Sequence, residues 1–294
     1  MTKTILVPTD FSENARKALN YAVGLALQQG YTLQLVHVYQ ALTSRFGDEK
    51  FNREIIDHAE TEAMHKLEEL RVTIQEEHPN LKISTDCIAG DQPSAVLTQI
   101  AGKAHNELII MGTKGAGGLK HRLMGSNTYQ TITNSPIPVL AVPEAYDNFK
   151  LERVGLLSNF KKIELEIARA FTAIFGKNLQ FTVLHVQERA SPSKEDNIQL
   201  EKELEAWKNH LIDKTGILDI TWAVDSTMNR LDVTETLPDC IHHMAEDHDL
   251  HMLLVSYNTK SFFQRVFSRS LVKNIAHQIQ RPVFFFKEGI DNQK

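Results

Sequence analysis

Glycines and small hydroxyl residues after one apolar run form the first candidate site. The run 108–111 leads into Gly112-Thr113-Lys114-Gly115, and nine residues later Gly125-Ser126-Asn127-Thr128 opens a helical stretch. Glycines let the backbone turn and expose N–H groups, and such concavities bind anions. A helix N-terminus adds unpaired N–H groups and the positive end of a dipole. These segments predict a phosphate-binding loop, with Ser126 as the N-cap of the helix.

A carboxylate follows another apolar run. Ile5-Leu6-Val7 leads into Pro8-Thr9-Asp10. A carboxylate at a strand end can accept hydrogen bonds from ribose hydroxyls or an adenine amino group, or hold Mg²⁺ through water. Asp10 could instead cap the following helix or lie exposed. Lys114, Lys120 and Arg122 could add charge-assisted contacts to a phosphate, or form a solvated loop face.

The chain repeats itself. The run 5–11 resembles 154–160, since both are apolar and end in a small polar residue, Asp or Asn, then Phe. Leu-Val-His-Val at 35–38 matches 183–186 at an offset of 148, and 136–142 matches 280–286 at an offset of 144. Collinear matches at a nearly constant offset predict tandem copies of one domain. We place the copies at 1–146 and 150–294.

Short apolar runs alternate with longer amphipathic stretches in each copy. The predicted strands are 4–8, 33–38, 83–88, 108–112 and 138–142, then 152–157, 180–186, 219–224, 251–256 and 282–286. Ser12 is typical of a helix N-cap, and 51–78 has helical periodicity. Continuous apolar strands joined by helices predict an α/β fold, with a five-stranded parallel sheet flanked by helices in each copy. Ligands of such sheets lie at the carboxyl ends of the strands.

Composition excludes several classes of protein. The 294 residues are 42% hydrophobic and carry a formal net charge of -5, which disfavours disorder and generic nucleic-acid binding. No window approaches eighteen consecutive apolar residues, so we expect no membrane span. Cys87 and Cys240 lie far apart and predict neither a thiolate metal site nor a disulfide framework. The apolar run at the N-terminus is too short for a signal peptide, so we expect a cytoplasmic protein.

The spacing G-x2-G-x9-G-[S/T], met by Gly112, Gly115, Gly125 and Ser126, resembles the ATP-binding signature of the universal stress protein (UspA) family. The P-T-D-F-S opening at 8–12, the His-Val pair at 37–38 and the P-x-P-V ending at 136–139 resemble that family too. The resemblance implies a Rossmann-like domain of the adenine nucleotide alpha hydrolase-like type. It implies ATP, ADP or AMP as the cofactor, with Mg²⁺, and domain pairing through the last strand; homodimerisation stays open.

The resemblance also implies which residues hold the nucleotide. Asp10 and the main chain of Val38 would hold adenosine. The phosphates would be held by Gly112, Gly115, Gly125, Ser126, Asn127 and Thr128. The flanking residues Pro8, Thr9, Met111, Thr113 and Lys114 complete the predicted cofactor-binding set. We predict no catalytic residue and no metal ligand from the chain itself.

The second copy departs from the signature. At an offset of 144, Ser256, Thr259 and Arg269 replace the three glycines and only Ser270 keeps its type; Asn159 replaces Asp10, and Phe262-Phe263 replaces the segment Gly117-Gly118. Side chains there occupy the space that phosphate oxygens need, and turns with positive φ become costly. We therefore predict that the second copy does not bind ATP in the manner of the family.

The remaining candidates for metal-binding or catalytic residues are histidines. His37 and His185 lie inside strand patterns and are typical of hydrogen-bonded core histidines. In the stretch 242–251, His243 and Asp247 have i,i+4 spacing, which metal ligands use, but a polar helix terminus is the alternative. No residue is an obvious general base for attack on a γ-phosphate. We favour nucleotide binding over enzymatic turnover; the alternatives are a slow Mg²⁺-dependent ATPase that uses Asp10 and a structural stress protein without nucleotide.

Overall fold

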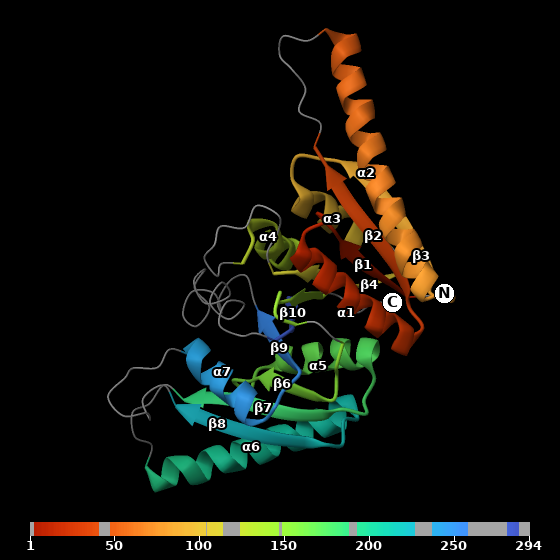
Figure 1. Cartoon of the computed structure of the whole chain (residues 1–294). Helices are drawn as coiled ribbons and strands as arrows, with labels where there is room; N and C mark the ends of the chain where they lie inside the picture. The colour runs from red at the N-terminus through yellow and green to blue at the C-terminus, as the bar shows by residue number, and fades with distance from the viewer. Residues whose placement is uncertain are drawn as a thin grey trace. The chain divides into compact units, whose positions relative to one another are not determined.

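The structure is a computed structural model that describes residues 3–40, 48–103, 105–113, 124–146, 149–187, 193–226, 237–257 and 281–287. The chain divides into two units, Met1–Phe149 and Lys150–Lys294. In each unit strands alternate with helices along the chain (Figure 1).

The first unit contains a parallel sheet. Its strands are β1 (Thr4–Pro8), β2 (Thr32–Tyr39), β3 (Ile83–Ala89), β4 (Asn106–Gly112) and β5 (Val139–Val142). They lie in the order β3-β2-β1-β4-β5, and all the pairs are parallel. In β1, residues 5–7 are fully buried, because both faces of the sheet are covered. Parallel pairing brings the carboxyl ends of all these strands to one edge.

Helices cover both faces of this sheet. They are α1 (Glu13–Gln29), α2 (Glu49–Glu77), α3 (Pro93–Ala101) and α4 (Ser126–Asn134). Right-handed crossovers and the helix–strand contacts put α1 and α2 on one face and α3 and α4 on the other (Figure 1). The predicted N-cap of α1 is confirmed, because Ser12 Oγ accepts the N–H of Ala15 at 3.2 Å. Helix α1 ends at Gly30, whose φ of 71° suits glycine.

The second unit has the same strand arrangement. Its strands are β6 (Arg153–Leu157), β7 (Gln180–Gln187), β8 (Ile220–Ser226), β9 (Met252–Tyr257) and β10 (Val283–Lys287). Their order is β10-β9-β6-β7-β8, again parallel. The described helices are α5 (Lys162–Phe175), α6 (Lys194–Thr215) and α7 (Leu237–Asp247). Phe171, Phe181 and Phe284 pack edge to face in its core.

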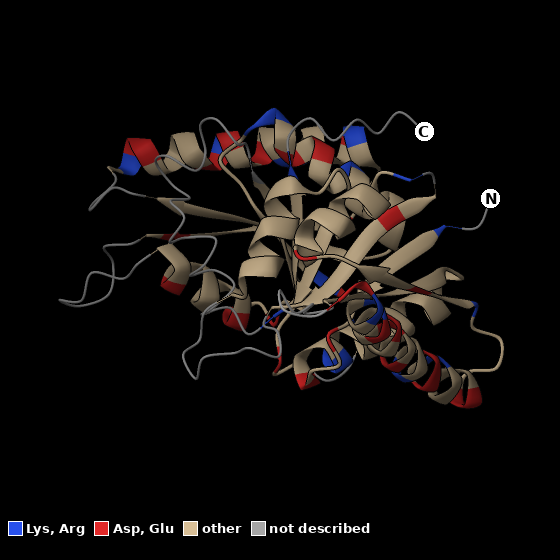
Figure 2. Cartoon of the chain, turned by 90° about the horizontal axis from the view of Figure 1, so that it is seen from above, with Lys and Arg blue, Asp and Glu red and all other residues tan. Residues whose placement is uncertain are grey.

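The predicted α/β class with parallel sheets is confirmed. Each of the ten predicted strands lies within two residues of an observed strand at both ends. The helix predicted at 51–78 spans 49–77, and its N-cap is Asp48, which accepts the N–H of Phe51 at 2.8 Å. None of the described helices is long and apolar enough to cross a membrane. The long helices α2 and α6 carry charges of both signs (Figure 2), several of them paired within one turn, such as Lys66 with Glu62.

Phe149, the last residue of the first unit, packs against Gly24 on α1. A Cβ at Gly24 would lie 2.5 Å from Cβ of Phe149, whose ring also packs edge to face on Tyr21 at 5.0 Å. We expect Gly24→Val to displace Phe149 and to lower the free energy of unfolding by about 1–3 kcal/mol, because the added atoms overpack the contact. Urea denaturation measures this loss.

A second glycine in the same unit is the control. Gly102, at the end of α3, has φ -72°, and the nearest atom to an added Cβ is 3.6 Å away. Gly102→Ala is expected to be neutral or to stabilise by about 0.4–1 kcal/mol, since alanine adopts this backbone freely. If both variants lower the free energy of unfolding equally, the Phe149 contact does not explain the loss at Gly24.

Candidate functional site

The predicted segments meet at the carboxyl edge of the first sheet. Pro8-Thr9-Asp10 ends β1, Val38 lies at the end of β2, and Met111-Gly112-Thr113 ends β4. Strand β1 pairs with β2 on one side and with β4 on the other. The chain leaves β1 toward β2 and leaves β4 toward β5, so the strand order reverses between β1 and β4. Such a switch point is where open parallel sheets bind ligands.

The turn from β1 to α1 is held by its own hydroxyl and carboxylate. Thr9 is buried; its N–H bonds to Val36 O at 2.9 Å, and its Oγ1 accepts the N–H of Phe11 at 3.0 Å. Phe11 has a φ of 61°, a left-handed conformation that is uncommon for a residue with a side chain. Asp10 is exposed, and its Oδ1 accepts the N–H of Ser12 at 3.1 Å and the hydroxyl of Ser12 at 2.5 Å. The carboxylate therefore orders this turn and also faces solvent.

His37 fastens the same turn to β2. Its Nδ1 lies 2.7 Å from the carbonyl oxygen of Thr9, and its ring packs on Phe11 at 4.5 Å. Because a carbonyl only accepts, Nδ1 carries the hydrogen. His37 is half-buried and hydrogen-bonded, as the core-histidine interpretation predicts. Its neighbour Val38 is half-buried beside Gly90, where a Cβ would lie 3.3 Å from Val38 Cγ1.

Gly112 lies where α1 comes closest to β4. A Cβ at this position would lie 2.4 Å from Oδ1 and 2.9 Å from the main-chain oxygen of Asn14. The positive-φ glycines of the described chain do not include Gly112, so the expected role in a left-handed turn is wrong for this residue. The physical reason for glycine is the close approach of α1.

The first turn of α4 is open. Gly125 N bonds to Thr113 O at 2.8 Å, which places the start of α4 beside the end of β4. The predicted N-cap is wrong: the N-cap is Gly125, no side chain caps the helix, and Ser126 is its first residue. Ser126 and Asn127 are exposed. Thr128 is buried instead, and its hydroxyl donates to Gly112 O at 2.9 Å.

Some predicted residues lie outside the described part of the chain. In the first unit these are Lys114, Gly115, Gly117, Gly118, Lys120 and Arg122. In the second unit they are Thr259, Phe262, Phe263, Arg269 and Ser270. Met111 is described and is buried at 7% exposure, so its side chain packs in the sheet core.

Two further residues lie at this edge that sequence patterns did not predict. Asn14 is buried in the first turn of α1, touches the Gly112 position and donates from Nδ2 to Val142 O at 3.4 Å. Phe11 was only part of the repeat pattern, yet its ring packs on His37 and is 37% exposed. For Asn14 the sequence offers one signal, which is an asparagine in the first turn of an otherwise apolar helix face.

The second unit builds the same turn. Ser158 N bonds to Leu184 O at 2.9 Å, Ser158 Oγ accepts the N–H of Phe160 at 3.2 Å, and Phe160 has a φ of 59°. His185 Nδ1 lies 3.0 Å from Ser158 O, with its ring 5.0 Å from that of Phe160. This turn therefore does not depend on the glycine signature.

One buried carboxylate distinguishes the second turn. Glu164 is 2% exposed; its Oε1 accepts the N–H of Asn159 at 2.7 Å and its Oε2 accepts the hydroxyl of Ser158. Burial raises the pKa of Glu164, although these hydrogen bonds act in the opposite direction. Helices α1 and α5 begin at an offset of 149, so the matching residue of the first unit is Ala15. Ser256, the counterpart of Gly112, is buried with its side chain accommodated.

The histidine-rich stretch is divided between two elements. His242 lies on α7, with Nε2 3.5 Å from Oε1 of Glu246, whereas His251 lies just before β9. Helix α7 ends at Asp247, which agrees with the helix-terminus alternative. Among the described residues, no group of three or more His, Cys, Asp or Glu side chains is arranged to hold a metal ion.

Known proteins match the first unit by sequence. The profile of the Universal stress protein family matches residues 1–143. Universal stress protein MJ0577 of Methanocaldococcus jannaschii is 30% identical over 157 residues, which cover 48% of this chain and 95% of that protein. A universal stress protein in Thermus aquaticus is 28% identical over 142 residues, covering 48% of this chain and 99% of its own. The chain belongs to the universal stress protein family.

Solved structures match nearly the whole chain. The universal stress protein from Archaeoglobus fulgidus covers 97% of this chain and 98% of its own, with a TM-score of 0.66 at 21% identity. At this level of identity, the likeness establishes the fold.

Proposed function

We propose that this protein is a nucleotide-responsive stress-response module that binds ATP, or ADP or AMP, with Mg²⁺ in its first unit alone. The observation that carries the proposal is the open first turn of α4, with Ser126 and Asn127 exposed, at the same sheet edge as the exposed Asp10. The unpaired N–H groups and the dipole of a helix N-terminus favour phosphate oxygens.

The rest of the edge supplies the nucleoside half of the proposed site. Val38 offers its main chain to the adenine, and Asp10 offers carboxylate oxygen to the ribose or, through water, to Mg²⁺. Pro8, Thr9 and Met111 shape the strand ends. Thr113 holds Gly125 through its carbonyl oxygen, and Thr128 holds Gly112 through its hydroxyl, so both fix the positions of the phosphate-binding glycines.

The second unit is proposed not to bind nucleotide. In its turn, the Glu164 carboxylate accepts the hydrogen bonds of the Ser158 hydroxyl and the Asn159 N–H, which would otherwise be available to a ligand. A carboxylate so close to the strand end disfavours an anionic ligand, and Ser256 adds a side chain where the first unit has Gly112. We propose that this unit serves instead as a partner domain paired with the first within the chain.

Binding without rapid turnover is the proposed mode of action. Both hydrogen bonds from Ser12 go to Oδ1 of Asp10, so this carboxylate is part of the turn, and we assign it to binding rather than to proton abstraction. Nucleotide would act on the segment 113–124 between β4 and α4, and so change a surface that a partner reads. Neither Cys87 nor Cys240 forms a disulfide, and we propose a cytoplasmic location for the protein.

A charge at the start of α4 tests the proposal. Ser126→Asp adds a carboxylate at an exposed first helical position, which stabilises a helix by about 0.3–1 kcal/mol and repels phosphate. We expect a thermal midpoint no lower than that of the wild type and at least tenfold weaker binding of ATP·Mg²⁺, about 1.4 kcal/mol. Calorimetric titration measures the affinity.

The control places the same charge at the other end of the helix. Asn134 is exposed and is the last residue of α4. Asn134→Asp is expected to leave the affinity for ATP unchanged. Absence of binding heat with wild-type protein at millimolar nucleotide would refute the proposed function. Sustained ADP release that disappears in Asp10→Ala would favour the ATPase alternative.

A further inference from the structure

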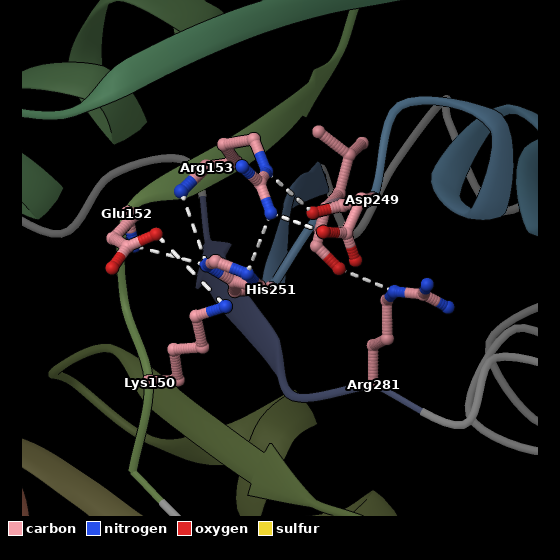
Figure 3. A network of polar contacts seen from close by, with 7 residues as sticks. Lys150, Glu152, Arg153, Asp249, His251 and Arg281 are labelled. Atoms are coloured by element: carbon pink, nitrogen blue, oxygen red, sulfur yellow. Dashed lines mark hydrogen bonds and ion pairs between the residues drawn. The ribbon is translucent and has the colours of Figure 1, made fainter.

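An imidazole of the second unit holds the segment through which the chain enters that unit. His251 lies immediately before β9 and is 4% exposed. Its Nδ1 accepts two main-chain hydrogen bonds, from Glu152 N at 3.1 Å and Arg153 N at 3.3 Å (Figure 3). The N–H of His251 donates in turn to Arg153 O at 2.8 Å. Ring and main chain of one residue thus fasten the start of β6.

These contacts require a neutral ring. A nitrogen that accepts hydrogen bonds carries no hydrogen, so the hydrogen of the imidazole is on Nε2. Protonation would put an N–H on Nδ1, pointing at two other N–H groups. The N–H groups of Glu152 and Arg153 would then lose their acceptor. Both bonds are partly buried, so each loss costs less than the roughly 1–3 kcal/mol of a fully buried donor.

Charged groups surround the ring from each neighbouring segment. Lys150 and Glu152 lie on the entering segment, with Lys150 Nζ 4.0 Å from Glu152 Oε2. Arg153 is on β6, and its Nη2 lies 3.3 Å from His251 Nε2. Because arginine only donates and Nε2 carries the hydrogen in this tautomer, this is a contact between a cation and the ring and not a hydrogen bond. Asp249, from the turn after α7, pairs with Arg153, and Arg281, before β10, donates to Leu250 O. Figure 3 shows Glu152 paired with Lys150 and Asp249 paired with Arg153. The pKa of His251 is lowered by burial, and then by the charges of Lys150 and Arg153.

The first unit lacks this imidazole. Ile5 pairs with Leu108 and Val154 pairs with Met252, so the residue that corresponds to His251 is Glu107. Glu107 lies 3.9 Å from Lys3 Nζ and is about one-third exposed. An imidazole that protonation can charge is therefore present at this position in the second unit and not in the first.

We propose that His251 is an acid-sensitive latch: protonation of Nδ1 breaks the bonds to Glu152 and Arg153 and releases the entering segment 150–153 of the second unit. The latch is independent of nucleotide binding. It gives the second unit a direct response to acidification, through a group that holds the segment by which the chain enters that unit.

The direction of the pH dependence follows from the lowered pKa. The folded state prefers the neutral ring, so the contribution of the latch to stability is complete above 6.5, the ordinary pKa of histidine. It is lost as pH falls below 6.5 and through the lower pKa of the folded state. A drop in pH, and not a rise, opens the latch.

Amide hydrogen exchange at Glu152 and Arg153 tests the latch in the full-length chain. With intrinsic rates corrected for pH, protection of these two amides is expected to fall at least tenfold between pH 7.5 and pH 5, while protection of the Leu156 amide in β6 is retained. In His251→Asn, whose amide oxygen accepts near the Nδ1 position and does not titrate, protection should not change with pH. His248→Asn, at an exposed histidine of the preceding turn, should behave like the wild type.

Two outcomes would overturn the latch. One is wild-type protection that is equal at both pH values, and the other is an equal loss in His251→Asn. If that variant does not fold, the His251 ring is titrated by NMR in the wild type. A midpoint below 6.5 with hydrogen on Nε2 supports the latch, and a midpoint at or above 6.5 contradicts it.

Discussion

Gly112→Val is expected to destabilise the first unit by about 1–3 kcal/mol or somewhat more, because the nearest obstruction includes a main-chain oxygen that cannot rotate away. The added Cβ would lie 2.9 Å from Asn14 O and 2.4 Å from Asn14 Oδ1. The helix α1 and the strand β4 must then separate at the candidate site. We also expect the variant to lose any thermal stabilisation by ATP·Mg²⁺, and urea and thermal denaturation measure the two effects.

The second unit provides the matched control for Gly112. Ser256 occupies the corresponding position and is buried with a side chain in place, so Ser256→Ala should change the free energy of unfolding by less than about 1 kcal/mol. Asn14→Ala removes Oδ1 but keeps the main-chain oxygen, so it should recover part of the loss in Gly112→Val. Strictly additive losses would show that the Asn14 side chain is not the obstruction.

The second large effect is expected at Glu164. Glu164→Ala leaves the buried Ser158 hydroxyl and the partly buried Asn159 N–H without their acceptor. An unsatisfied buried group costs about 1–3 kcal/mol, and the partly buried amide costs less. Glu164→Gln keeps one acceptor and removes the buried charge. Because burial raises the pKa of Glu164, the wild type should lose stability relative to Glu164→Gln as pH rises from the ordinary value of 4.5 through the raised pKa of the folded state.

Urea denaturation of wild type and both variants at several pH values between 4 and 8 measures these differences. Glu166 lies on the same helix and is not the acceptor of the hydrogen bonds from Ser158 and Asn159, so Glu166→Gln serves as the charge-matched control. If the stability of wild type and Glu164→Gln changes in parallel over the whole range, the Glu164 carboxyl titrates normally. That result would remove the argument that a buried charge closes this turn.

The strands and their order of appearance follow from local pattern. Runs such as Ile5–Val7 are continuously apolar because helices cover both faces of a parallel sheet, and that requirement is visible in the residues themselves. The N-cap at Ser12 is equally local, since it depends on residues within one turn. The placing of Asp10, Val38 and Gly112 at one edge also follows, because parallel strands share the direction of their ends.

The reasons for the residue types at individual positions of the site depend on contacts between segments that are far apart in the sequence. Gly112 is glycine because Asn14, ninety-eight positions earlier in the chain, comes within contact distance, and no spacing rule shows this. The N-cap of α4 falls on Gly125 because the helix begins at Ser126, one residue earlier than an N-cap at Ser126 would allow. His251 could not be separated from the neighbouring histidines until its ring was seen against the main chain of Glu152 and Arg153.

The internal carboxylate of Glu164 has a consequence for dose response. In the second unit Glu164 accepts the hydrogen bonds of the turn, and the proposed site of the first unit stays open to ligand. If so, a single chain binds one nucleotide. Its titration curve is then hyperbolic, with a Hill coefficient of one. Any sigmoidal response to nucleotide must then come from coupling between associated chains.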